Sequence, residues 1–71
     1  MEVVVKVRFN ASKERIERFG NDRYLMYLPF EEDEDAEQVL ITLLSRYLGV
    51  PANRVEFKCF NSQKDRVFVV S

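Results

Sequence analysis

The sequence predicts a small α+β domain in which four strands form a sheet and one main helix covers one face of it. Three observations lead to this prediction. Apolar side chains alternate in residues 2–10, apolar side chains recur at helical spacing in residues 35–48, and two strand-like segments follow, separated by a short polar stretch. A two-residue period is typical of a half-buried strand and a 3.6-residue period of an amphipathic helix. The expected order of elements is strand, turn, strand, helix, strand, strand.

Residues 2–10 form the first expected strand, with four apolar side chains on one side and Val4 as the only apolar residue on the other. Residues 23–28 are apolar on both sides and predict the second strand. Pro29 ends this strand or sits at its edge, because proline lacks the N–H that a sheet needs. The pattern leaves open which side of this second strand faces the helix.

The segment between these strands, ASKERIERFG (residues 11–20), predicts a short helical turn. Ser12 is a suitable N-cap, and the spacing of Ile16 and Phe19 brings both beneath such a turn. The sequence Gly-Asn-Asp at 20–22 has turn chemistry, since glycine and asparagine tolerate positive φ.

Residues 35–48 predict the main helix, with either Asp33 or Asp35 as its N-cap. Gly49 suits the left-handed position that ends a helix, and Pro51 prevents its continuation. The apolar stripe that should face the sheet consists of Ala36, Val39, Leu40, Leu43, Leu44, Tyr47 and Leu48.

The last two expected strands are residues 54–60, which alternate, and residues 66–70, which are apolar on both sides. The polar stretch 61–65 between them has the length of a hairpin connection. Cys59 shares a parity with Val55 and Phe57, and we expect it to be buried as a small apolar side chain.

Composition limits the classes of function. Seventy-one residues form one domain (1–71) with a small core. One cysteine and no histidine exclude an internal disulfide and a Cys/His zinc site, and the net charge of −1 argues against broad electrostatic binding to nucleic acid. We find no signal peptide, membrane span, glycine-rich phosphate loop or catalytic triad. We therefore expect a cytoplasmic protein that is not an enzyme and holds no cofactor and no metal.

Three segments resemble the YggU-like family of small uncharacterised proteins: VRFNASK, LLSRYLGVPANRVEF and QKDRVFV. The resemblance spans nearly the whole chain and implies a two-layer fold with an antiparallel sheet of strand order 1-2-4-3 and a helix on one face. The segment before the helix departs from the family pattern, because it reads PFEEDEDAE here. The family has no established biochemical function, so the resemblance implies a fold and no activity.

An acidic run precedes and enters the expected helix, and it contains half of the twelve acidic residues. The positive end of the helix dipole accounts for two or three of these carboxylates, whereas neighbouring like charges repel one another. The run is thus a solvated helix start, a docking surface for a basic partner, or a divalent-cation site, although it lacks the EF-hand spacing. Its candidate interaction residues are Glu31, Glu32, Asp33, Glu34, Asp35 and Glu37.

Arg8, Lys64 and Arg66 are a candidate basic cluster. They are either ordinary surface residues or contacts for phosphate or RNA, with RNA only weakly supported by the net charge. If the last hairpin folds back near residues 29–35, these side chains face the acidic run.

The function that the sequence favours is a small protein-interaction module, and the alternative is weak binding of RNA or phosphate. A single helix covers only one face of a sheet, so the opposite face should expose apolar side chains for self-association or for a protein partner. That face is expected to carry Val4, one side of strand 23–28, and either Val67 with Val69 or Phe68 with Val70.

Overall fold

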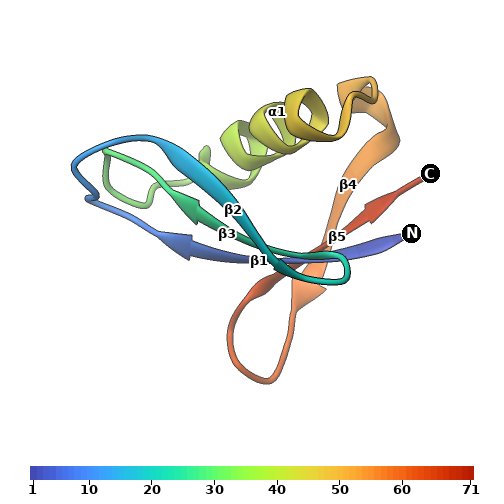
Figure 1. The fold of residues 1–71 in the computed structure, drawn as a ribbon, viewed down its shortest axis with the longest axis horizontal. Coiled ribbons are helices and arrows are strands. Elements are labelled where there is room, and N and C mark those ends of the chain that lie inside the picture. The colour runs from blue at the N-terminus through green and yellow to red at the C-terminus, as the bar shows by residue number, and fades with distance from the viewer.

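The computed structural model describes all 71 residues as one sheet with a helix packed on it (Figure 1). The sheet has five strands in the order β2-β3-β1-β5-β4. The elements in chain order are β1 (Glu2–Arg8), β2 (Arg15–Gly20), β3 (Arg23–Tyr27), α1 (Ala36–Leu48), a 3-10 turn η1 (Ala52–Arg54), β4 (Val55–Phe60) and β5 (Arg66–Val70).

The predicted four-stranded antiparallel sheet of order 1-2-4-3 is wrong. The sheet is mixed, because β1 runs parallel to β3, while β1 and β5, β2 and β3, and β4 and β5 pair in antiparallel fashion. The additional strand is β2, which occupies the segment for which the sequence predicted a helical turn.

Pairing with β3 explains why residues 15–20 are extended. Gly20 pairs with Arg23 across a two-residue turn, in which Asp22 adopts a positive φ of 55°. The hairpin places Ile16 opposite Met26, so Ile16 extends the apolar face of the sheet. The pairing with β3 outweighs the local capping that Ser12 offers, because alternate residue pairs add backbone hydrogen bonds and every pair adds side-chain contact.

The connection from β1 to β2 makes β3 parallel to β1. The chain leaves β1 and crosses the end of β3, where the Leu28 N–H donates to the Arg8 carbonyl and the Ala11 N–H donates to the Leu28 carbonyl, both over 2.9 Å. Strand β3 then enters the space between β1 and β2. Because β1 pairs with β3 on one side and with β5 on the other, it lies in the middle of the sheet. Its regular alternation of apolar and polar side chains nevertheless resembles that of an edge strand.

The core lies between α1 and one face of the sheet. Leu40 and Leu44 of the helix are fully buried against strand residues that include Phe68 and Met26. The predicted helix is confirmed to within one residue, and its end is as expected, since Gly49 adopts the left-handed conformation and its N–H donates to the Ser45 carbonyl. At 13 residues, α1 lacks the length and apolar character of a membrane-spanning helix.

The reverse face of the sheet is the side away from α1. As expected, Val4 lies there opposite Val67, and the pairing of strands also places Leu25 and Val69 on this face. Val67 is buried and the other three are half-buried. Long polar side chains lie on the same face, since Glu2 pairs with Val69 in the sheet and bonds to Lys58. Tyr24, Met26 and Leu28 face the helix, which settles the parity that the sequence left open.

Cys59 is exposed, and the prediction that it is buried is wrong. Strand β4 contains an irregularity between Phe57 and Cys59, so that Phe57 lies opposite Phe68 and Cys59 lies opposite Val67. A bulge adds one residue to a strand and thereby moves the following side chain to the other face. The extra residue therefore turns Cys59 away from the core.

Candidate functional site

The candidate site is the acidic loop, which we define as residues 31–35, together with the first turn of α1. All five residues of the acidic loop are exposed, and Glu37 on the helix is half-buried. The loop follows Phe30, whose carbonyl accepts a hydrogen bond from the Asn10 N–H over 2.9 Å. The start of the loop is therefore tied to the segment that follows β1.

Arg66 connects the acidic loop and the helix to the sheet. This side chain begins β5, lies on the helix side of the sheet and is only 6% exposed. Its Nε donates to Glu37 Oε2 over 2.8 Å, and its Nη2 donates to Glu32 Oε2. The sequence predicted that the basic cluster faces the acidic run if the last hairpin folds back near residues 29–35. This contact is present for Arg66. We call the set of Arg66, Glu32 and Glu37 the Arg66 clamp.

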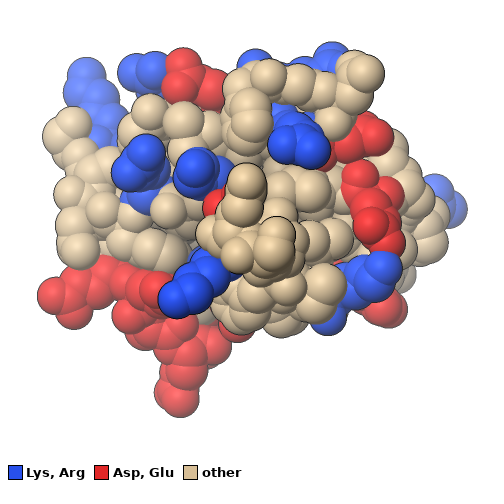
Figure 2. Space-filling model, turned by 90° about the horizontal axis from the view of Figure 1, so that it is seen from below, with Lys and Arg blue, Asp and Glu red and all other residues tan.

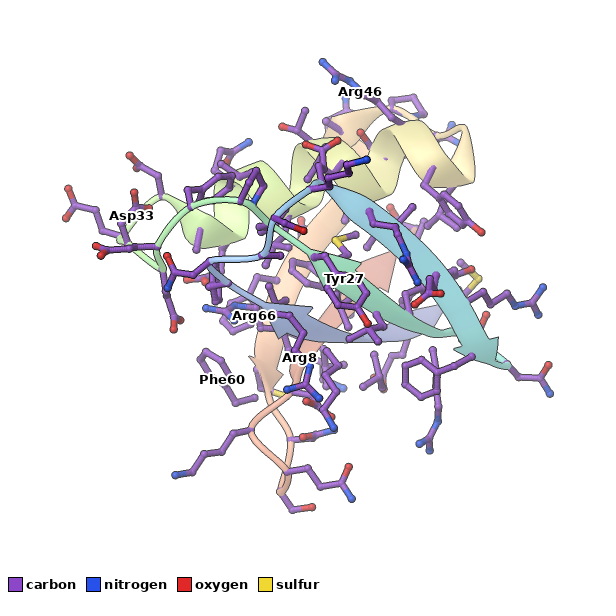
Figure 3. All side chains as sticks on the ribbon, turned by 60° about the vertical axis from the view of Figure 1, so that its left-hand side comes forward. Arg8, Tyr27, Asp33, Arg46, Phe60 and Arg66 are labelled. Atoms are coloured by element: carbon purple, nitrogen blue, oxygen red, sulfur yellow. The ribbon has the colours of Figure 1, made fainter.

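Two aromatic rings complete the surroundings of Arg66. Its Cζ lies 5.0 Å from the ring centroid of Phe60 and 5.6 Å from that of Phe9, distances at which a guanidinium is attracted to a ring face. Figure 3 shows Phe60 beside Arg66, with Asp33 projecting away at the outer side of the acidic loop. Through its two ion pairs and two ring contacts, Arg66 therefore connects β5 to the end of β4, the segment after β1, the acidic loop and α1.

The three residues of the predicted basic cluster do not share one surface. Arg8 pairs with Tyr27 and lies on the reverse face, whereas Arg66 lies on the helix side. Lys64 lies in the turn between β4 and β5 with a φ of 65°, and it lines a hollow of about 540 Å³ with Arg66. Two carboxylates balance the charge of Arg66, so this hollow offers an anion little net attraction.

Most carboxylates of the acidic loop lack a cationic partner. Glu31, Glu34 and Asp35 form no ion pair, and Asp33 Oδ1 accepts a hydrogen bond from the Asp35 N–H over 2.9 Å. Asp35 stands at the N-cap position of α1 without a side-chain capping bond. Figure 2 shows a large patch of acidic side chains at the lower left of the reverse face, further acidic side chains along the right-hand side, and Lys and Arg scattered between them. No group of three carboxylate or thiol side chains is arranged to hold a metal ion.

A second hollow, which we call the α1/β2 groove, lies between the helix and the strand that the sequence did not predict. Its volume is about 430 Å³. Its walls come from both elements and its floor includes the buried residues Met26 and Leu28. Tyr47 on the helix is 48% exposed here, and its ring makes an edge contact with Tyr24 at 5.4 Å between centroids. The lining comprises Glu14, Arg15, Ile16, Met26, Leu28, Leu43, Arg46 and Tyr47.

No protein-family model matches the chain, and no solved structure matches it. The resemblance to the YggU-like family stays a prediction, and the strand order that it implied is not the one observed.

Proposed function

We propose that this chain is a non-catalytic protein-interaction module whose acidic loop binds a basic segment of a protein partner. The observation that carries the proposal is the Arg66 clamp. Glu32 and Glu37 hold the loop against the sheet, while Glu31 and Glu34 stay exposed without an ion pair. A surface that is held in its binding conformation loses less conformational entropy when a partner docks.

The charge of the acidic loop supports a binding role because it exceeds what folding requires. Two carboxylates bond to Arg66, and Asp33 stabilises the turn that leads into α1. The others lie among like charges, and two such charges about 6 Å apart repel by about 0.7 kcal/mol even in water. A basic partner relieves this repulsion and gains long-range attraction as it approaches.

The reverse face contributes less to the proposal than the sequence suggested. Val67 is buried there, and Val4, Leu25 and Val69 are half-buried. We place the module in the cytoplasm, where a reducing environment keeps the exposed thiol of Cys59 free.

The test measures binding of a fluorescent ten-residue Lys/Gly peptide by anisotropy at low and physiological salt. E31Q/E34Q removes two exposed carboxylates from the acidic loop and leaves the Arg66 clamp intact. At about 0.5 kcal/mol for each exposed ion pair, its affinity should fall about fivefold, and added salt should weaken the wild type more than this variant.

The matched control is D22N/E56Q, which makes the same change in net charge away from the acidic loop. Both residues are exposed and form no ion pair. The control should bind as the wild type does. Equal losses in both variants would show attraction to net charge alone, and preferential binding of a single-stranded RNA oligomer would favour the alternative function; either result overturns the proposal.

A further inference from the structure

Strand β2 is an edge of the sheet, and its outer side has no neighbour. It pairs with β3 alone, and the α1/β2 groove leaves the helix side of this edge open. An edge strand presents unpaired N–H and C=O groups that can pair with another strand. Phe19 in this strand is 54% exposed. The open edge lies apart from the acidic loop and has no role in the proposed function.

The sequence Glu-Arg-Ile-Glu-Arg at 14–18, which consists of the residue before β2 and the first four residues of the strand, is complementary to itself when it is reversed. If a second copy pairs in antiparallel fashion with Ile16 opposite Ile16, each Arg15 lies opposite a Glu17, and each Glu14 lies opposite an Arg18. The two-fold symmetry gives four pairs of opposite charge. Residues that lie directly opposite in antiparallel strands share a face, and oppositely charged pairs there are stabilising.

Neighbouring registers lack this complementarity. A shift by two residues places Glu17 opposite Glu17 or Arg15 opposite Arg15, and like charges directly opposite are destabilising. A shift by one residue would place side chains on the wrong faces. The charges therefore favour one register of pairing between two copies of β2. On an edge strand that is protected against pairing, the charges would instead disfavour every register.

We infer that this chain forms a two-fold symmetric dimer by antiparallel pairing of β2 with β2 of a second copy. The sheet continues across the pair, and both helices lie on the same side of it. Ile16 faces the helix side and lines the α1/β2 groove, so the two grooves adjoin at the symmetry axis. Each half-buried Ile16 there gains an apolar neighbour from the other copy.

The other edge strand, β4, is less suited to self-pairing. Glu56 and Lys58 flank Phe57, which resembles the pattern in β2, but the bulge between Phe57 and Cys59 interrupts the strand. Lys58 also bonds to Glu2 on the neighbouring part of the sheet. In β2 the irregularity lies between Arg18 and Gly20, outside the self-complementary segment.

The bond between Arg15 and Glu17 within one chain does not prevent dimer formation. Their side chains are 62% and 42% exposed, and the Nη2 to Oε2 distance is 2.6 Å. Exposed pairs of this kind contribute little to stability and rearrange readily. In the dimer both residues keep this bond and gain a partner across the strand.

The experiment uses two single charge reversals and their mixture. R15E places two acids at positions 15 and 17, and E17R places two arginines there, so each variant alone faces like charges across the dimer axis. Each should self-associate about thirtyfold more weakly than the wild type in sedimentation equilibrium. An equimolar mixture restores every opposite-charge pair and should form heterodimers, which native mass spectrometry distinguishes by mass. Circular dichroism checks that both variants fold.

A cysteine pair tests the register. In I16C/C59S the new thiols of two copies lie directly opposite, where Cβ atoms are about 5 Å apart, so mild oxidation should give a disulfide-linked dimer. N53C/C59S places the thiol at an exposed position far from β2 and should crosslink much more slowly. The inference is overturned if the wild type stays monomeric at about 1 mM, if the mixture fails to associate, or if the two cysteine variants crosslink equally fast.

Discussion

Arg66 and Glu37 are 29 positions apart in the chain, and a 2.8 Å hydrogen bond joins Nε of the first to Oε2 of the second. This bond ties the start of β5 to the first turn of α1. Together with the bond to Glu32, it gives part of the acidic run a structural role, which distinguishes these two carboxylates from those that form no ion pair.

Replacement of Arg66 by methionine should destabilise the protein. R66M removes the guanidinium, so Phe9 and Phe60 lose its attraction to their rings and Glu32 and Glu37 are left without a cation. Glu32 is more than half exposed, so water stabilises part of its unpaired charge. We therefore expect a loss of only about 2 kcal/mol in the free energy of unfolding in urea at pH 7. R66M/E32Q/E37Q should regain most of this loss, since it leaves no unpaired charge. A fully stable R66M would show that the clamp adds nothing.

Stability should depend on pH through the ion pair of Glu2 and Lys58. The hydrogen bond and charge of Lys58 hold the pKa of Glu2 below its usual value of 4.5, and the same contacts with Glu2 raise the pKa of Lys58 above 10.5. The Glu2 contribution is present above pH 4.5 and is lost as the pH falls through the lowered pKa. The Lys58 contribution is present below pH 10.5 and is lost as the pH rises through the raised pKa.

The comparison that isolates this pair is K58M against the wild type in urea titrations between pH 2 and pH 7. K58M should lose less stability on acidification, and 1 M NaCl should reduce the difference because both side chains are half exposed. Parallel pH profiles for the two proteins would contradict the assigned pair.

Gly49 should be intolerant of a side chain. Its φ of 71° disfavours residues with a Cβ atom, although nothing lies within 4 Å of the position that a Cβ would occupy. G49A should therefore cost about 1 kcal/mol in thermal or urea unfolding through backbone strain alone. G20A serves as the control, since a Cβ there makes only ordinary contact with Arg23. Equal destabilisation by both would argue against the left-handed cap.

Cys59 should react with a thiol reagent in the folded protein. The bulge in β4 places its side chain on the reverse face, where it is exposed. We expect one equivalent of Ellman's reagent to react in native buffer at a rate close to that measured in urea. Protection that is lifted only by unfolding would mean that β4 is regular and that Cys59 faces the core.

Local patterns predicted α1, β4 and β5 well because their signals lie within each segment. The apolar stripe and Gly49 define the helix, and alternation defines the start of β4. The acidic run was evident as a candidate site for the same reason. The division of roles within it was not, because the position of Arg66 depends on how β5 sits beside β1.

The amino-acid pattern alone is enough to identify which segments are apolar on one side, where the helix begins and ends, and where the chain carries its acidic charge. Three features emerge from the three-dimensional arrangement: residues 15–20 form a strand, β1 lies at the centre of a mixed sheet, and Arg66 holds Glu32 and Glu37. Periodicity along the chain reports which side of a segment is buried. Strand neighbours and ion pairs depend instead on how segments distant in sequence pack together.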